Sequence, residues 1–249
     1  EFHSLYTYYP PYIHSIMTIQ EIATLLNEKH QTRDLIISNA RAQFDSFKDR
    51  VIEFVTEINK QPNMQDFLVY KLNGDFELQL IFCGEVLIFS LHTDMFMFDD
   101  SHFVHNLKYV KDDRSRSYCA IIKVYNFLHD SFKYNRLYDV GYLIGRVFIN
   151  KDNHYFVEGK RQLGFLYNDF ENAEFNSVNQ TRLIESCLLY AMEFDLLVPP
   201  FDEVKEIPLG LKLEQQGNAA IKTGNVDFIL PLPEISLALR TLIMSGTNF

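Results

Sequence analysis

Three side chains in this sequence have the chemistry and the spacing of a metal-assisted hydrolase. Glu158 and Lys160 lie two residues apart in a segment with strand character, so both side chains point to the same side of the expected strand. Asp139 lies nineteen residues before Glu158, and Gln162 follows two residues after Lys160. Two carboxylates can bind Mg²⁺ through their oxygens, and a nearby lysine can polarise the water that attacks a phosphate. Asp139, Glu158 and Lys160 are therefore candidate catalytic residues, with Gln162 near the site.

The pattern is similar to the motif of the PD-(D/E)XK nucleases, and the similarity covers residues 139–162. The resemblance implies a metal-dependent nuclease in which Asp139 and Glu158 hold Mg²⁺ and Lys160 positions the attacking water. The alternative is a solvated strand face on which Glu158 and Lys160 pair with each other. The expected hairpin favours this alternative, because Arg146 rather than a second acid falls across from Glu158. Outside the nuclease hypothesis we expect no cofactor and no bound metal.

A second polar group lies between expected strands. His102 and His105 are three residues apart, so they could share a metal ion from one side of a helical turn that Asp99 or Asp100 caps. We favour the alternative of a solvated acidic loop with two surface histidines, because nothing in the sequence supplies the further ligands that fix a metal site.

Basic residues are concentrated in the middle of a chain that is acidic as a whole. The formal net charge is −10, yet residues 108–161 contain eleven Lys/Arg and six Asp/Glu, a net of +5 that leaves −15 for the rest. Phe and Tyr are interleaved with these cations, a combination that holds phosphates and stacks bases. We therefore expect a non-enzymatic binding or regulatory module that contacts an anionic ligand or nucleic acid. The candidate ligand-binding residues are Lys108, Lys111, Arg114, Arg116, Arg146 and Arg161. The alternative is that these cations pair with acidic neighbours inside the fold.

Cysteine usage and hydropathy bear on the compartment. The three cysteines, Cys83, Cys119 and Cys187, are odd in number and far apart, which is typical of a reduced, cytoplasmic protein. No apolar run approaches the length of a membrane helix, and no secretion signal is recognisable. We expect no membrane association.

An apolar stripe of helical period dominates residues 32–60. Its members are spaced three or four apart, which keeps them on one face of a straight helix, and no Gly or Pro interrupts them. The stripe consists of Ile36, Ala40, Phe44, Phe47, Val51, Val55 and Ile58. Pro62 ends the helix, because proline lacks an N–H and disfavours helix in the residue before it. A short helix is expected before it at 19–29, with Thr18 and Glu21 as a capping box.

The period then changes to two, which is typical of strands. Strands are expected at 67–72, 76–82, 86–92 and 95–98, and Asn73-Gly74 predicts a type I′ turn in the first hairpin. Further elements are expected in the second half of the chain. These are strands at 118–127, 142–149 and 154–162 with an extension at 163–167, a helix at 182–196 capped by Asn179 or Thr181, a strand at 226–232 and a helix at 233–245.

These elements predict an α+β fold, in which N-terminal helices cover an antiparallel β-meander, followed by a second β-rich portion and C-terminal helices. We expect residues 1–16 to be a non-native or extension segment. Residues 17–249 should form a single domain, with a weak point of division near 108–117. A third hypothesis for function is a structural or assembly protein, in which the helix at 32–60 or leftover apolar surface forms a homo-oligomer.

Overall fold

The computed structural model describes residues 17–193 together with residues 202, 206 and 209, and these residues have the expected α+β architecture. Within them, seven strands form one antiparallel sheet in the order β1-β2-β3-β5-β6-β7, and β4 pairs with β5 beside this path. The strands are β1 (Leu68–Leu72), β2 (Glu77–Phe82), β3 (Glu85–Leu91), β4 (Phe96–Met97), β5 (Tyr118–Leu128), β6 (Tyr142–Asn150) and β7 (Tyr155–Gly159). The helices are α1 (Ile19–Asn59), α2 (Lys108–Asp112), α3 (His129–Lys133) and α4 (Ser177–Met192), and the 3₁₀ turns are η1 (Phe103–Asn106), η2 (Arg114–Ser117) and η3 (Arg161–Gly164).

The N-terminal helical region is one helix. α1 runs without a break from Ile19 to Asn59, so the prediction of separate helices at 19–29 and 32–60 is wrong. Residues 27–34 are all polar and interrupt the apolar stripe, but they include no Gly or Pro, and therefore nothing ends the helix there. The capping box of Thr18 and Glu21 is confirmed at the start of this helix.

β1, β2 and β3 form the expected meander, but its tightest turn is not where we predicted it. A type I′ turn needs a positive φ at both central residues. Cys83 (φ 46°) and Gly84 (φ 82°) meet this condition between β2 and β3, whereas at Asn73-Gly74 only Gly74 has a positive φ. The connection between β1 and β2 is longer, and the Asn73 amide donates to the carbonyl oxygen of Glu77 across it.

The strands on either side of residues 108–117 belong to the same sheet. β5 pairs with both β3 and β6, so the expected second β-rich portion continues the meander. The last strand is shorter than predicted, because β7 ends at Gly159 and the chain turns at Arg161, which has a positive φ of 47°. The predicted strand extension at 163–167 is therefore wrong, and η3 occupies its first residues.

α4 begins earlier than predicted. Asn176 caps it, and the Asn176 side chain accepts a hydrogen bond from the Asn179 amide, so the predicted caps at Asn179 or Thr181 are wrong. Gln180 in this first part of the helix is fully buried, and such a polar residue hides the helix from a purely apolar pattern. The predicted strand at 226–232 and helix at 233–245 lie outside the described residues.

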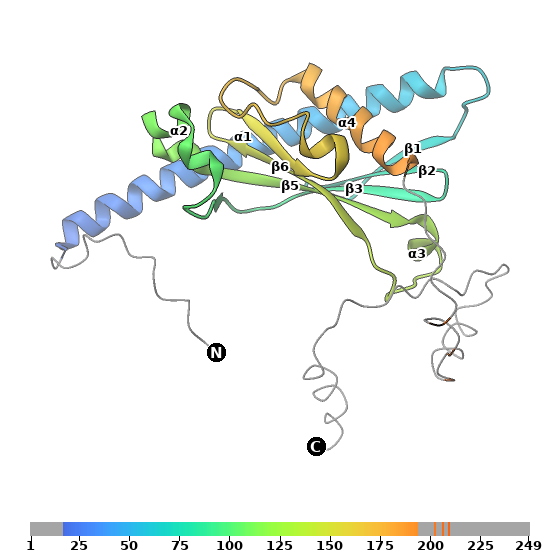
Figure 1. Ribbon diagram of the computed structural model, residues 1–249, viewed down its shortest axis with the longest axis horizontal. Helices are drawn as coiled ribbons and strands as arrows, with labels where there is room; N and C mark the ends of the chain where they lie inside the picture. The colour runs from blue at the N-terminus through green and yellow to red at the C-terminus, as the bar shows by residue number, and fades with distance from the viewer. Residues whose placement is uncertain (1–16, 194–201, 203–205, 207–208, 210–249) are drawn as a thin grey trace.

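The two faces of the sheet are covered differently. Figure 1 shows α1 and α4 on the same side of the sheet, and the main apolar core lies between them and the strands. Phe47 of α1 packs against Phe89 of β3 and Phe175 at ring-centroid distances of 5.1 and 5.9 Å. The opposite side, here called the open face, carries a smaller apolar cluster beneath η1 and α2 that includes Phe148 and Phe156. None of the described helices is both long and apolar enough to span a bilayer.

Candidate functional site

The two carboxylates of the nuclease hypothesis have separate partners. Asp139 lies in the loop after α3, and its Oδ2 is 2.9 Å from Nε of Arg136. Glu158 lies on β7 and forms an ion pair with Arg146, its direct neighbour on β6. The other oxygen of Glu158 is 3.2 Å from Nε2 of His102. The structure thus places Glu158 where the sequence predicted it, across from Arg146, without bringing Asp139 to the same partners.

Lys160 and Gln162 are both engaged in holding the turn after β7. The Lys160 amide donates to the carbonyl oxygen of Ile144 at 3.0 Å, and Gln162 Nε2 donates to the carbonyl oxygen of Ser186 at 3.3 Å. Among residues 17–193 no three His, Cys, Asp or Glu side chains are grouped closely enough to hold a metal ion. The nuclease hypothesis stays a prediction, and the arrangement of these residues adds no support to it.

The two histidines of η1 face different partners. His102 stacks on Phe98 with a centroid distance of 4.5 Å and an interplanar angle of 15°, and it points to Glu158. His105 Nε2 lies 3.2 Å from the carbonyl oxygen of Phe98. His102 therefore links η1 to β7, and the two rings do not share a ligand.

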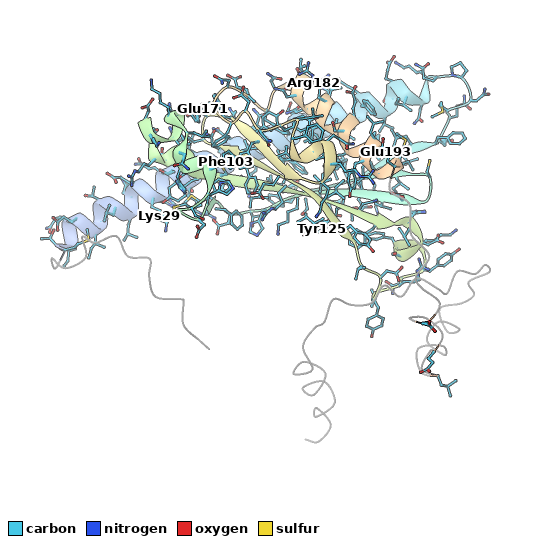
Figure 2. The ribbon with its side chains drawn as sticks, viewed as in Figure 1. Lys29, Phe103, Tyr125, Glu171, Arg182 and Glu193 are labelled. Carbon is cyan, nitrogen blue, oxygen red and sulfur yellow. The ribbon has the colours of Figure 1, made fainter. Side chains whose placement is uncertain are left out.

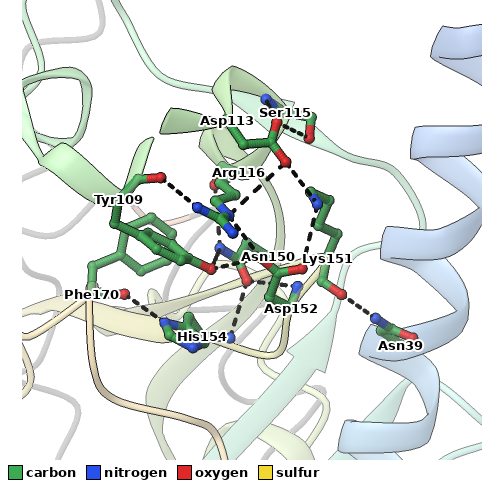
Figure 3. A network of polar contacts seen from close by, with 10 residues as sticks. All are labelled: Asn39, Tyr109, Asp113, Ser115, Arg116, Asn150, Lys151, Asp152, His154 and Phe170. Carbon is green, nitrogen blue, oxygen red and sulfur yellow. Dashed lines mark hydrogen bonds and ion pairs between the residues drawn. The ribbon is translucent and has the colours of Figure 1, made fainter. Parts of the chain in front are cut away.

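Arg116 belongs to a polar network that ties residues 108–117 to the turn between β6 and β7 (Figure 3). Its Nε donates to Asp152 and its Nη1 to the carbonyl oxygen of Tyr109, both at 2.9 Å. The Tyr109 hydroxyl donates to Asp152 at 2.9 Å and accepts from Asn150 at 3.1 Å, while its ring stacks on His154. Burial raises the pKa of Tyr109 to about 12, so the hydroxyl keeps its proton and its donor role.

Asp113 and Lys151 extend this network towards α1. Asp113 accepts hydrogen bonds from the Ser115 hydroxyl at 2.6 Å and from Lys151 Nζ at 2.9 Å. These contacts, that of Ser115 first, lower the pKa of Asp113 to about 2. Asn39 of α1 donates to the carbonyl oxygen of Lys151, which joins the turn to the long helix. Each charge in this network is paired within the fold, so the network holds residues 108–117, the turn between β6 and β7 and α1 together.

Three of the six candidate cations of the basic segment are paired. The pairs are Arg116 with Asp152, Arg146 with Glu158, and Arg161 with Glu193. The other three, Lys108, Lys111 and Arg114, are exposed on α2 and η2, and none of them forms an ion pair within the described part of the chain. Pairing therefore accounts for half of the cations that the sequence suggested for ligand binding.

A polar row crosses the open face on five neighbouring strands. Consecutive members are direct cross-strand partners, so their side chains stand side by side about 5 Å apart. The row consists of Glu77, Ser90, Lys123, Arg146 and Glu158. All five are half-buried, and the apolar cluster under η1 lies beside the members of the row on β5, β6 and β7. Figure 2 shows Tyr125, the next residue of β5 on this face, on the side of the sheet away from Arg182 of α4.

Lys123 is the residue of this row that our sequence analysis missed. Like charges directly opposite each other destabilise a sheet. The charge of Arg146 is offset by its ion pair with Glu158, whereas Lys123 has no carboxylate partner among residues 17–193. The pairing of Lys123 with Arg146 depends on the register of β5 and β6, which includes a bulge beside Val124. The signal in the sequence was only that Lys123 lies within the basic segment.

Comparison with known proteins gives no match. No protein-family model matches this chain, and no curated protein or solved structure matches it significantly.

Proposed function

We propose that this protein is a non-enzymatic binding module whose open face binds an anionic group, a phosphate or a carboxylate, between Lys123 and Arg146. The observation that carries the proposal is Lys123, a half-buried cation directly opposite Arg146 and without a carboxylate partner in the described residues. A bound anion would offset the repulsion between the two cations. The hydroxyls of Ser90 and Tyr125, which neighbour Lys123 on this face, can donate to its oxygens.

Arg146 is well suited to such a role because its position is fixed. Its guanidinium lies 5.4 Å from the ring centroid of Phe148 and pairs with Glu158, which His102 contacts from the other side. A cation that is already ordered loses little conformational entropy when it binds a ligand. Two charge-assisted hydrogen bonds of about 1.5–3 kcal/mol each support a dissociation constant of roughly millimolar to tens of micromolar.

The exposed cations of α2 and η2 support binding of a polyanion, in addition to a single anion at Lys123. Lys108, Lys111 and Arg114 lie within seven residues and carry no ion pairs in the described chain, so they could hold further phosphates of a polyanion. A polyanion that contacts them would show a steep loss of affinity with salt, whereas a single anion at Lys123 would show a shallow one. Salt dependence therefore distinguishes nucleic acid from a small anionic ligand.

The test is a binding measurement on matched variants. Calorimetry with inorganic phosphate, a nucleoside monophosphate and a small dicarboxylate covers single anions, and fluorescence anisotropy with labelled single- and double-stranded oligonucleotides covers polyanions. Lys123→Met should weaken binding about 10- to 100-fold, the effect of losing one charge-assisted contact. Lys133→Met is the control, because Lys133 is an exposed lysine of α3 outside the polar row.

Each outcome has a definite meaning. Binding that Lys123→Met leaves unchanged contradicts the proposed site, and the absence of binding by every anion contradicts the function. Oligonucleotide binding lost in Lys108→Met and Lys111→Met instead would move the site to α2. Shortened oligonucleotide in the presence of Mg²⁺, abolished by Glu158→Gln, would favour the nuclease alternative.

A further inference from the structure

The first part of α1 carries an apolar stripe that none of the described residues covers. Figure 1 shows residues 19–34, here called the arm, projecting beyond the end of the sheet. The apolar side chains of the arm are exposed, at 82% for Ile19, 45% for Ile22, 51% for Leu25 and 65% for Leu26. Apolar side chains gathered in this way on an exposed surface mark an interaction site.

The stripe of the arm continues the buried face of α1. Ile22 and Ile36 are fourteen residues apart, close to four turns of an α-helix, so they lie on the same side. Ile36 is fully buried beneath the sheet and Ile22 is half-exposed, because the sheet does not reach as far as the arm. The stripe from Ile36 to Val55 is already used inside the chain, so it is not available for association with another molecule.

The apolar face of the arm packs against none of the described residues. The arm is the continuation of the packed part of α1, so it does not need to form its own nucleus, but most helical stability in proteins comes from packing of the apolar face. The capping box of Thr18 and Glu21 strengthens the free end of the arm but covers none of the stripe. The arm therefore has the form of a helix made to pack against another surface.

We propose that the arms of two copies of this chain pair antiparallel about a twofold axis near Leu25 and Leu26. In this register Leu25 lies opposite Leu26 of the second copy, and Ile22 lies opposite the second copy's Lys29, whose aliphatic stem covers apolar surface. The tip of the arm at Ile19 then lies opposite the second copy's Thr32. The arm is about 24 Å long, and it overlaps its copy along its whole length without reaching the other sheet.

The length and the charges of the arm favour a second copy as the occupant. An isologous contact needs a stripe that is complementary to itself, and a stripe with leucines at its midpoint meets this condition. Glu21 comes to lie beside the second copy's Lys29, and the twofold axis produces this contact twice. A single pair of short arms buries less than the roughly 1,200 Å² of a standard interface, so the dimer should be weak and dependent on concentration.

The first test is sedimentation equilibrium of the full chain from low to high micromolar concentration. The wild type should shift from monomer towards dimer as the concentration rises. Leu26→Glu should weaken association at least tenfold, because it places a charge at the centre of the contact. Gln31→Glu, on the opposite side of the same helix, should leave association unchanged while altering the charge equally. Far-UV circular dichroism of both variants shows whether the fold is retained.

The second test fixes the orientation by cysteine cross-linking. Cys83→Ser removes the exposed cysteine, and Cys119 and Cys187 are buried. In this background, oxidation should link Leu25→Cys across the twofold axis. Ile19→Cys should remain unlinked, because the antiparallel register separates its two copies by about 20 Å. A chain that stays monomeric at every concentration overturns the proposal, as does a dimer unaffected by Leu26→Glu or a cross-link at position 19. The proposal is independent of anion binding at Lys123.

Discussion

The contact between Gly141 and Phe127 makes a sharp prediction about stability. A Cβ atom at Gly141 would lie 2.1–2.4 Å from three ring carbons of Phe127, far inside the usual van der Waals distance. The ring is also in edge contact with Phe132 of α3, at a centroid distance of 5.4 Å, so it is flanked on both sides. Gly141→Ala must therefore move either the ring or the chain that leads into β6.

The expected cost follows from the size of this displacement. The ring has to shift by more than 1 Å to restore normal contact, and overpacking of this kind costs about 1–3 kcal/mol. We expect Gly141→Ala to lower the free energy of unfolding by about 2 kcal/mol. For a fold of this size that loss corresponds to a decrease of about 4–8 °C in Tm. Urea unfolding followed by far-UV circular dichroism measures it directly.

A double-mutant cycle separates the contact from any effect on the backbone. In Phe127→Ala the ring is gone, and Gly141→Ala should then be neutral or stabilise by about 0.5 kcal/mol, because alanine restricts the unfolded chain. The coupling between the two positions should be roughly 2 kcal/mol. If Gly141→Ala costs the same in both backgrounds, the ring contact is not the cause and the reasoning is refuted.

Three further effects can be measured by the same unfolding assay. Cys83→Asn should stabilise the fold by about 0.5 kcal/mol, because asparagine tolerates the positive φ of this turn better than cysteine; an unstable variant would contradict this. Asn176→Ala should lower the free energy of unfolding by about 1 kcal/mol, because it removes the cap of α4. Asn176→Asp keeps the hydrogen-bond acceptor and should leave the free energy of unfolding nearly unchanged. The pKa of Asp113 is lowered from 3.8 to about 2, so its ionised carboxylate stabilises the fold above pH 4, and this stabilisation is lost as the pH falls towards 2. Asp113→Asn should lower the free energy of unfolding at pH 7 by about 1 kcal/mol, a small value because the carboxylate is 38% exposed. An equal loss at pH 2 and pH 7 would contradict the assignment.

The helices and strands with strong periodicity were predictable from sequence. The stripe from Ile36 to Val55 and the apolar positions Leu78 and Leu80 of β2 are buried, and burial is what such patterns report. Two of the helix boundaries that failed are set by polar residues. Residues 27–34 continue α1 because no residue there opposes a helix, and Gln180 is buried in α4 through hydrogen bonds that no pattern reveals.

The candidate site was predictable only in part, because its residues are brought together by strand register. The sequence placed Arg146 across from Glu158 correctly, since a short turn joins β6 and β7. Lys123 meets Arg146 across strands whose connection is longer and whose ladder contains a bulge. A shift of one residue would turn Lys123 to the other face of the sheet. The pairing therefore depends on packing that a single sequence does not display.

Part of the positive charge of residues 108–161 is used for ion pairs within the fold. Arg116 and Arg146 have matched carboxylates, and their charges hold the turn after β6 and the strand β7 in place. An excess of positive charge in one segment of an acidic chain is therefore weak support for a ligand, because pairing within the fold can account for it. A cation that has no carboxylate partner among the described residues is stronger support. By this criterion Lys123 outranks the paired arginines, because its neighbour in the sheet is another cation and a bound anion would stabilise both.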